Sequence, residues 1–184
     1  HEAGLAFEAI PAPTKTHKLP DGTDYYTINP LGYVPYLTLD DGRSLHEGPA
    51  IVQYIADQVP AKNLAPVNGT YARYKLQEWL TFIGTELHRS FSPLFDPATP
   101  AETKAAAITK LQGRLNWVDG ELADKQYLMG DSFTVADGYL FTVTNWAQYV
   151  GLDLSPYANI VAYRARVAAR PAVVAAMKAE GLLK

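Results

Sequence analysis

The chain has 184 residues, a formal net charge of -3 and a hydrophobic fraction of 48%, so one large or two small domains with a packed core are expected. The absence of excess positive charge argues against nucleic acid as the main partner. Cysteine is absent from the sequence, which excludes a disulfide framework and a thiolate zinc site within these residues. No apolar run approaches the roughly 18 residues of a spanning helix, so no membrane segment is predicted.

The beginning of the chain predicts one strand followed by a surface excursion. Leu5 to Ile10 is a short apolar run with prolines directly behind it, so a strand is expected there. Residues 12–31 are polar and rich in turn-forming residues, with one weak helical turn expected around Tyr25.

A hairpin and a helix are predicted next. Pro35 precedes a short apolar run at 36–39, and an Asp-Asp-Gly turn leads from this run into a second one, which is typical of two antiparallel strands. Pro49 suits the first turn of a helix, where no N–H is required, so a helix is expected from Pro49 to about Gln58.

The junction of these elements has the features of a ligand site. An X-Pro bond is the only common place for a cis peptide, and a cis Val34-Pro35 bond would turn the backbone of Val34 outward to pair with another extended backbone. Glu47 and the amide of Gly48 fall at the helix N-terminus, which places free N–H groups beside a carboxylate. A ligand with an α-amino and an α-carboxylate group on one carbon matches both.

The composition changes across residues 60–69, which read PAKNLAPVNG. We expect a domain boundary in this stretch, with a first domain at 1–62 and a second at 69–184. All later predicted elements are helices, at about 71–89, 101–124, 139–150, 156–169 and 171–180.

Several features of the second domain predict its packing. The helix at 101–124 repeats apolar residues at alternating spacings of three and four, which indicates an amphipathic seam. Thr134 and Asp137 fit a capping box before an apolar helix, so Asp137 is interpreted as structural. Ser92-Pro93 and Asp96-Pro97 are expected to break the first helix of the domain, and Gly84 is expected to allow another helix or a ligand to approach closely.

These residues together resemble the glutathione S-transferase family. The first domain carries the motif of the glutathione-binding half, GDSFTVADGYLF is similar to the signature of the helical domain, and residues 76–95 resemble the bacterial, beta-class members in particular. The resemblance covers essentially the whole chain. The motif positions in the first domain are Asn29, Pro30, Gly32, Val34, Pro35, Leu37, Asp41, Gly42, Leu45, Glu47, Gly48, Ala50, Ile51, Tyr54 and Ile55.

The resemblance implies an α/β thioredoxin-like N-terminal domain followed by an all-α C-terminal domain. Val34, before a cis Pro35, would bind the cysteinyl backbone of glutathione, and Glu47 with the Gly48 amide would hold the γ-glutamyl end. Many relatives carry Ser or Thr at the position of Gly48, so one hydroxyl contact is missing. His17 stands where a basic residue reaches the glycyl carboxylate.

In the second domain, the resemblance places His88 and Arg89 opposite the glutathione thiol. A histidine there can stabilise a thiolate or donate a hydrogen bond to it. Phe91 and Trp146 match apolar positions that line the electrophile pocket. Thr81 replaces an asparagine that reaches glutathione in the partner subunit, which leaves that contact without its usual donor.

Each of these assignments has a structural alternative. Pro35 can belong to a tight turn without a ligand, and Glu47 can be a plain capping charge. His88 can be an ordinary surface histidine, and Trp146 can belong to the core.

The first strand and most of the first helix of the family have no counterpart in this sequence, by average element lengths on the order of fifteen to twenty residues. The thioredoxin-like domain is therefore expected to be incomplete. The residue that activates the sulfur, a Cys, Ser or Tyr in the family, belongs to this absent segment and is assigned to no residue here.

We expect a bacterial-type glutathione S-transferase that conjugates the glutathione thiolate to hydrophobic electrophiles, with glutathione as cosubstrate and no metal. A cytoplasmic homodimer without nucleic-acid or membrane partners is expected. Two alternatives stay open: glutathione-dependent thiol exchange, dehalogenation or peroxide reduction, and a non-catalytic binding protein with the transferase fold.

Overall fold

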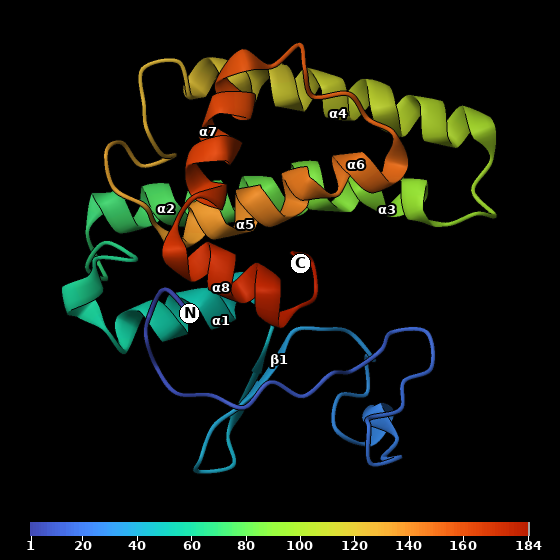
Figure 1. The fold of residues 1–184 in the computed structure, drawn as a ribbon, viewed down its shortest axis with the longest axis vertical. Helices are drawn as coiled ribbons and strands as arrows, with labels where there is room; N and C mark the ends of the chain where they lie inside the picture. Colours follow the sequence, from blue (N-terminus) through green and yellow to red (C-terminus); the bar gives the residue numbers. More distant parts are fainter. Residues whose placement is uncertain (184) are drawn as a thin grey trace.

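The computed structural model describes residues 1–183, which form a short hairpin followed by helices. The elements are η1 (Tyr25–Thr27), β1 (Tyr36–Thr38), β2 (Ser44–His46), α1 (Gly48–Asp57), η2 (Pro60–Lys62), α2 (Tyr71–Phe82), η3 (Ile83–His88), α3 (Arg89–Phe95), α4 (Ala101–Glu121), α5 (Val135–Asn145), α6 (Ala147–Val150), α7 (Ala158–Ala168) and α8 (Pro171–Ala179). Figure 1 shows the hairpin at one end of the molecule, α1 and α8 above it, then α2, α3 and α5, and α4 at the far end. Within residues 1–183, no helix has the length and hydropathy needed to cross a membrane.

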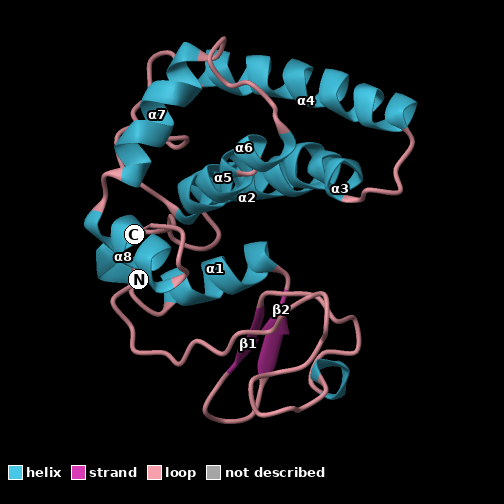
Figure 2. Ribbon diagram, turned by 45° about the vertical axis from the view of Figure 1, so that its right-hand side comes forward, coloured by secondary structure: helices cyan, strands magenta, loops and turns pink. Residues whose placement is uncertain are grey.

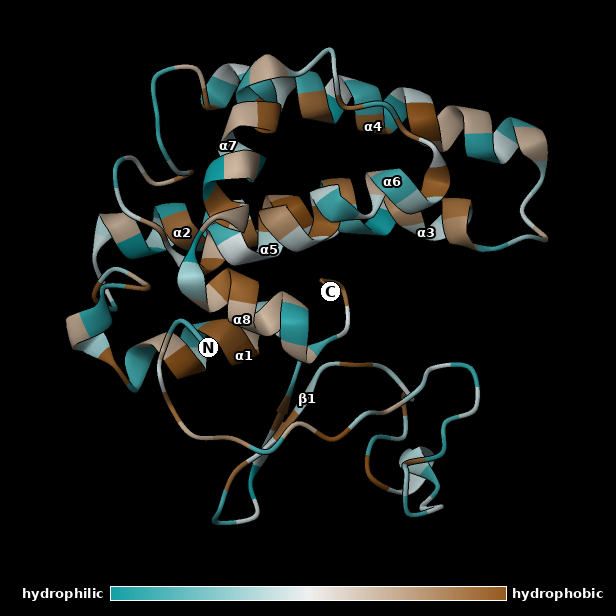
Figure 3. Cartoon of the chain, viewed as in Figure 1, coloured by the Kyte–Doolittle hydropathy of each residue, from teal (hydrophilic) through white to brown (hydrophobic). Residues whose placement is uncertain are grey.

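The hairpin and the helix that follows it form as predicted. Strands β1 and β2 pair antiparallel, with Leu37 opposite Leu45. The turn between them contains Gly42 at a φ of 82°, a conformation that glycine adopts without steric cost. Figure 2 shows α1 immediately after the two strands, and most of α1 is coloured hydrophobic in Figure 3.

The prediction of a strand from Leu5 to Ile10 is wrong. These residues are irregular, and the side chains of Leu5, Phe7 and Ile10 are exposed. A strand needs a neighbour to satisfy its backbone groups, and no described residue pairs with this segment. The hydrophobic side chains of this segment suggested a buried strand, but among the described residues no neighbouring strand covers them.

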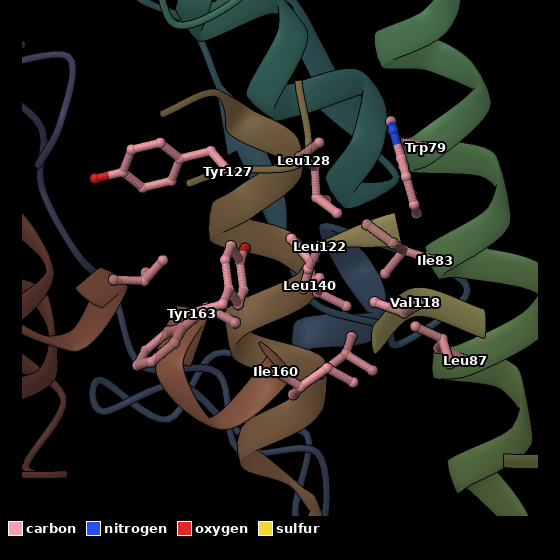
Figure 4. Close-up of a cluster of buried hydrophobic side chains, with 14 of the residues drawn as sticks. Trp79, Ile83, Leu87, Val118, Leu122, Tyr127, Leu128, Leu140, Ile160 and Tyr163 are labelled. Atoms are coloured by element: carbon pink, nitrogen blue, oxygen red, sulfur yellow. The ribbon is translucent and has the colours of Figure 1, made fainter. Parts of the chain in front are cut away.

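The core lies mainly in the helical part, and α5 runs through its centre as expected. The seam of α4 packs against α3, η3 and α7, and several side chains of this core appear together in Figure 4. The fully buried members of the cluster include Leu76, Ile83, Leu87, Leu111, Leu115, Val118, Leu140, Val143, Ile160 and Val167.

The helix that begins at Tyr71 continues to Phe95 and contains one turn of π-helix, Ile83–His88. The prediction that Ser92-Pro93 breaks this helix is wrong, whereas the helix does end at the second predicted break, Asp96-Pro97. Pro93 lies inside α3, two residues before its end. A proline removes one i→i−4 hydrogen bond, and few bonds remain to be lost so close to the helix end.

A buried arginine joins the helical part to α1. Arg73 of α2 is 2% exposed, and its guanidinium donates to both carboxylate oxygens of Asp57 at 2.8 and 2.7 Å. The same group donates to the backbone oxygen of Pro66 at 2.8 Å and to Gln53 at 3.3 Å. Asp57 and Gln53 belong to α1, so one side chain ties α1, the connecting segment and α2 together.

Candidate functional site

The loop before β1 presents an unpaired backbone residue beside the start of α1. The Val34-Pro35 bond is cis, as expected. Pro35 packs against the helix start, because a Cβ atom added to Gly48 would lie 3.7 Å from its Cγ. Val34 is 49% exposed, and its backbone has no hydrogen-bond partner in the described backbone. This backbone is available to an extended ligand.

Glu47 occupies the N-cap position of α1 in an unusual conformation. Its φ is 70°, and its side chain makes no capping hydrogen bond. The carbonyl of Glu47 accepts hydrogen bonds from the N–H groups of Ala50 and Ile51 at 3.0 Å, so its backbone forms part of the helix start. Its exposed carboxylate forms no hydrogen bond with the helix. The N–H of Gly48, in the first turn, has no intrahelical acceptor. The start of α1 therefore offers a free N–H group that can bind an anion and, next to it, a carboxylate that can bind a cation.

His17 lies against the same loop. Its ring stacks on Tyr26 with centroids 4.4 Å apart. Gly32 is in the left-handed region at a φ of 69°, and a Cβ there would come within 2.6 Å of the Tyr26 ring and 2.9 Å of Nε2 of His17. Glycine is thus required at this position, two residues before Val34, for the His17 ring to pack there.

His88 ends the π-helical turn and belongs to an aromatic cluster. Its Nδ1 lies 2.8 Å from the hydroxyl oxygen of Tyr139 on α5. The Trp146 ring stands nearly perpendicular to the imidazole, with centroids 4.6 Å apart. Trp146 also contacts Phe91 and Phe95 edge to face, at 5.8 and 5.7 Å. Turns of π-helix inside α-helices occur frequently at functional sites.

The charge of Glu47 acts on this cluster. Burial lowers the pKa of His88, and the nearby negative charge of Glu47 partly offsets the shift. Burial also raises the pKa of Tyr139 to about 12, and Glu47 contributes to that rise. Helix α1 packs against α5, so the start of α1 and the Tyr139 residue of α5 belong to neighbouring elements.

Not every residue predicted for the site has the expected surroundings. Phe91 is 1% exposed, so it packs beneath the aromatic cluster as part of the core. Arg89 begins α3 with an exposed side chain, and none of the hydrogen bonds or ion pairs described above involves it. Sequence reasoning missed Tyr139 and Phe95 as members of the cluster. The spacing of seven residues, two helical turns, places Tyr139 on the same helix face as Trp146, but it does not predict the contact with His88.

A separate polar cavity of about 550 Å³ lies away from these residues. Its lining includes Lys62, Tyr127, Phe133 and Arg170. Glu2 already neutralises the guanidinium of Arg170, with contacts of 2.6 and 2.9 Å. The Arg170 guanidinium is therefore already paired and is not available to hold an acidic ligand. Among residues 1–183, no cluster of three or more His, Asp or Glu side chains is arranged to hold a metal ion.

Comparison with known protein families decides the relationship. Residues 1–58 match the family described as glutathione S-transferase, N-terminal domain, and residues 78–171 match glutathione S-transferase, C-terminal domain. The chain belongs to the glutathione S-transferase family. The relationship expected from the motifs is thereby confirmed, as is the fold class of a small thioredoxin-like domain followed by a helical one.

Individual relatives cover nearly the whole chain. Glutathione S-transferase GstA of Escherichia coli O157:H7 is 47% identical over 98% of this chain and 90% of the relative. The structure of a ternary complex of BphK, a bacterial transferase of this family, is 54% identical over 98% of this chain and 90% of its own, with a TM-score of 0.97. A sphingomonad glutathione S-transferase in complex with glutathione is 48% identical over 99% of this chain and 90% of its own, with a TM-score of 0.95.

Proposed function

We propose that this glutathione S-transferase family member conjugates the thiolate of glutathione to hydrophobic electrophiles. The observation that carries the proposal is the start of α1, where Glu47 has an exposed carboxylate without a capping hydrogen bond and Gly48 packs against Pro35 of the cis Val34-Pro35 bond. The bound glutathione of the sphingomonad relative supports the choice of ligand. Glutathione is an extended peptide with one ammonium and one carboxylate at its γ-glutamyl end, and these groups match this arrangement.

Each part of the site has one task in this proposal. The backbone of Val34 pairs with the cysteinyl residue, Glu47 holds the ammonium, and the Gly48 amide holds the adjoining carboxylate. His17 stands at the glycyl end. His88, with Arg89 beside it, faces the sulfur, and Trp146 with Phe91 below it forms the apolar wall for the electrophile.

The reaction with an aryl halide forms one bond and breaks one. The glutathione thiol first loses its proton to solvent, and the resulting thiolate attacks the carbon that bears the halogen. A carbon–sulfur bond forms, and the halide leaves with the electron pair of the carbon–halogen bond. The chain contributes positioning and stabilisation of the thiolate. No residue among the 184 is assigned as the group that deprotonates the thiol.

Calorimetric titration with glutathione, followed by turnover of 1-chloro-2,4-dinitrobenzene, tests the proposal. We expect saturable binding and release of chloride in equal amount to conjugate. Binding without turnover of aryl halides, alkyl halides, disulfides or peroxides would favour a non-catalytic binding protein. Absence of glutathione binding would refute the site as assigned.

We also propose a homodimer that acts in the cytoplasm, formed through an aromatic patch of Trp79, Phe82 and Trp117. Trp117 is 46% exposed, and its ring contacts those of the buried Trp79 at 5.3 Å and the half-buried Phe82 at 4.6 Å. Exposed aromatic groups of this kind are enriched at interfaces. Sedimentation equilibrium of the wild type and of Trp117→Glu tests the proposal. We expect a dimer for the wild type and a monomer for the variant, whereas a monomeric wild type would refute it.

A further inference from the structure

The hydroxyl of Tyr139 contacts Nδ1 of His88 across two helices. The two atoms lie 2.8 Å apart, although the residues are 51 positions apart in the chain. Gly84 lies one helical turn before His88, and a Cβ at its position would be 3.5 Å from the Tyr139 hydroxyl, which is an ordinary contact distance. A larger side chain at Gly84 would occupy the space that the hydroxyl uses.

The imidazole of His88 is held on two sides. Trp146 stands across the ring at 4.6 Å, and the Tyr139 ring lies at 5.8 Å in an edge-on arrangement. Nδ1 is occupied by the Tyr139 hydroxyl, and no described residue forms a hydrogen bond with Nε2. Nε2 is thus the ring nitrogen available to a ligand.

The direction of the hydrogen bond depends on the tautomer of His88, because the Tyr139 hydroxyl can donate to Nδ1 or accept from an Nδ1–H group. Burial raises the pKa of Tyr139 to about 12, so the hydroxyl keeps its proton at neutral pH. Burial lowers the pKa of His88, which favours the neutral ring. Nδ1 of His88 is the ring nitrogen within hydrogen-bond reach of this hydroxyl. A neutral imidazole that accepts at Nδ1 carries its proton on Nε2.

We propose that Tyr139 is a positioning residue that holds the proton of His88 on Nε2, so that this nitrogen donates a hydrogen bond to the glutathione sulfur. The inference rests on the proposed function, since it gives the reason for the orientation of His88 in that site. A thiolate accepts hydrogen bonds and does not donate them. A ring with its proton on Nδ1 would present a lone pair to the sulfur and repel it.

Nitrogen-15 NMR of the histidine rings tests the inference without reference to activity. Spectra at about pH 8, above the ordinary histidine pKa, distinguish the two neutral tautomers. The His88 signals are assigned by their loss in His88→Gln. We expect the wild type to contain the Nε2–H tautomer alone, and Tyr139→Phe to contain a mixture, because phenylalanine keeps the ring packing and removes the donor.

Two matched pairs of variants separate the hydrogen bond from general damage. Tyr149→Phe removes an exposed hydroxyl away from His88 and is expected to leave the tautomer unchanged. Gly84→Ala adds a Cβ at an ordinary contact distance of 3.5 Å and is expected to keep the bond, whereas Gly84→Val is expected to displace the hydroxyl and to give the same mixture as Tyr139→Phe.

Kinetics supply the second readout. In single turnovers of the aryl halide, Tyr139→Phe is expected to slow the chemical step about three- to tenfold, the rate equivalent of one hydrogen bond. The KM for glutathione should be unchanged, because Val34, Glu47 and Gly48 are intact.

Two NMR results would overturn the inference: a wild-type His88 protonated on Nδ1, or a tautomer that stays pure in Tyr139→Phe. If the wild type shows neither glutathione binding nor turnover, the proposed function fails while the NMR result still decides the tautomer. The wild-type spectrum decides the first point even if a variant does not fold.

Discussion

Glu47 combines an exposed carboxylate with a backbone conformation that residues with a side chain rarely adopt. Such conformations cost on the order of 1–3 kcal/mol and cluster at functional sites. An ordinary capping residue would return part of this cost through a hydrogen bond to the helix, and Glu47 makes none. The conformation is therefore better explained by ligand binding than by helix stability.

Replacement of Glu47 should separate binding from folding. Glu47→Ala is expected to weaken glutathione binding more than tenfold, since a charged hydrogen bond is worth about 1.5–3 kcal/mol. The free energy of unfolding should hardly change, because the side chain makes no helix contact to lose. Calorimetry and urea unfolding measure the two quantities. Glu102→Ala, which removes a glutamate from the first turn of α4, is the control and should change neither; equal affinity in Glu47→Ala and wild type would remove Glu47 from the site.

Gly48 offers a gain-of-binding experiment. Its φ is not in the left-handed region, and a Cβ would meet Pro35 at an ordinary 3.7 Å, so a side chain fits. Gly48→Ser is expected to bind glutathione about three- to tenfold more tightly than Gly48→Ala, because only serine adds a hydroxyl for the carboxylate. Titration of both variants gives the ratio, and equal affinities would mean that the carboxylate lies elsewhere.

For individual residues, the sequence allowed prediction of local motifs but not of contacts between distant parts of the chain. Val34, Pro35 and Glu47 are close in sequence, and the known demands of cis bonds and helix starts were enough to single them out. The His88–Tyr139 bond depends on how η3 and α5 cross, and on a π-turn that rotates His88 relative to a regular helix. No local pattern encodes that crossing.

Among the helical elements, α5 begins at an unusually well-satisfied carboxylate. Asp137 is fully buried, and it accepts hydrogen bonds from the backbone of Leu128 and Thr134 at 2.8 Å, from the Thr134 hydroxyl at 3.0 Å and from the Tyr163 hydroxyl at 3.2 Å. Burial nevertheless raises the pKa of Asp137. Asp137 therefore stabilises the start of α5 mainly as a hydrogen-bond acceptor for these four donors, and its negative charge contributes less.

Removal of the whole carboxyl group and removal of its charge alone should therefore lower the free energy of unfolding by different amounts. Asp137→Ala leaves several buried donors without an acceptor and should lower the free energy of unfolding by about 3 kcal/mol or more. Asp137→Asn keeps one acceptor and should cost about half as much. Urea unfolding measures both, and equal losses would show that the charge itself stabilises α5.

Helical periodicity predicted the elements well, because burial of one face determines them locally. The seam of α4 and the capping box of α5 were both recognisable in this way. Two errors have physical causes beyond the local sequence. The run from Leu5 to Ile10 has strand-forming residues without a described partner strand, and Pro93 is tolerated because it lies near the end of α3.

Across the whole molecule, the pair of Arg73 and Asp57 joins the two parts of the chain. Arg73 is buried, while the Asp57 side chain is 36% exposed. The Arg73 guanidinium, through its hydrogen bonds, holds the pKa of Asp57 below its usual range. Loss of Asp57 would leave a buried cation with only neutral partners.

The contribution of this pair should depend on pH. A carboxyl with a lowered pKa in the folded state stabilises above its unfolded pKa, about 3.9, and the stabilisation is lost as the pH falls through the folded pKa. Asp57→Asn should therefore lower stability by about 2 kcal/mol near neutral pH, with a difference from wild type that shrinks below about pH 4. Urea unfolding of both proteins at several pH values measures this difference in stability.

Asp41→Asn, which breaks the exposed pair with Arg43, is the control. A stability difference between Asp57→Asn and wild type that stays constant down to low pH would contradict the role of the Arg73–Asp57 pair.

The proposed site takes its groups from two parts of the chain. Val34 and Glu47 lie beside the hairpin and α1, whereas His88 lies at the end of η3. A ligand that binds groups of both parts stabilises them together, and at one hundred times its dissociation constant it adds about 2.7 kcal/mol to the stability of the folded state. Glutathione is therefore expected to act as a thermodynamic link between the hairpin region and the helices, in addition to its part in the reaction.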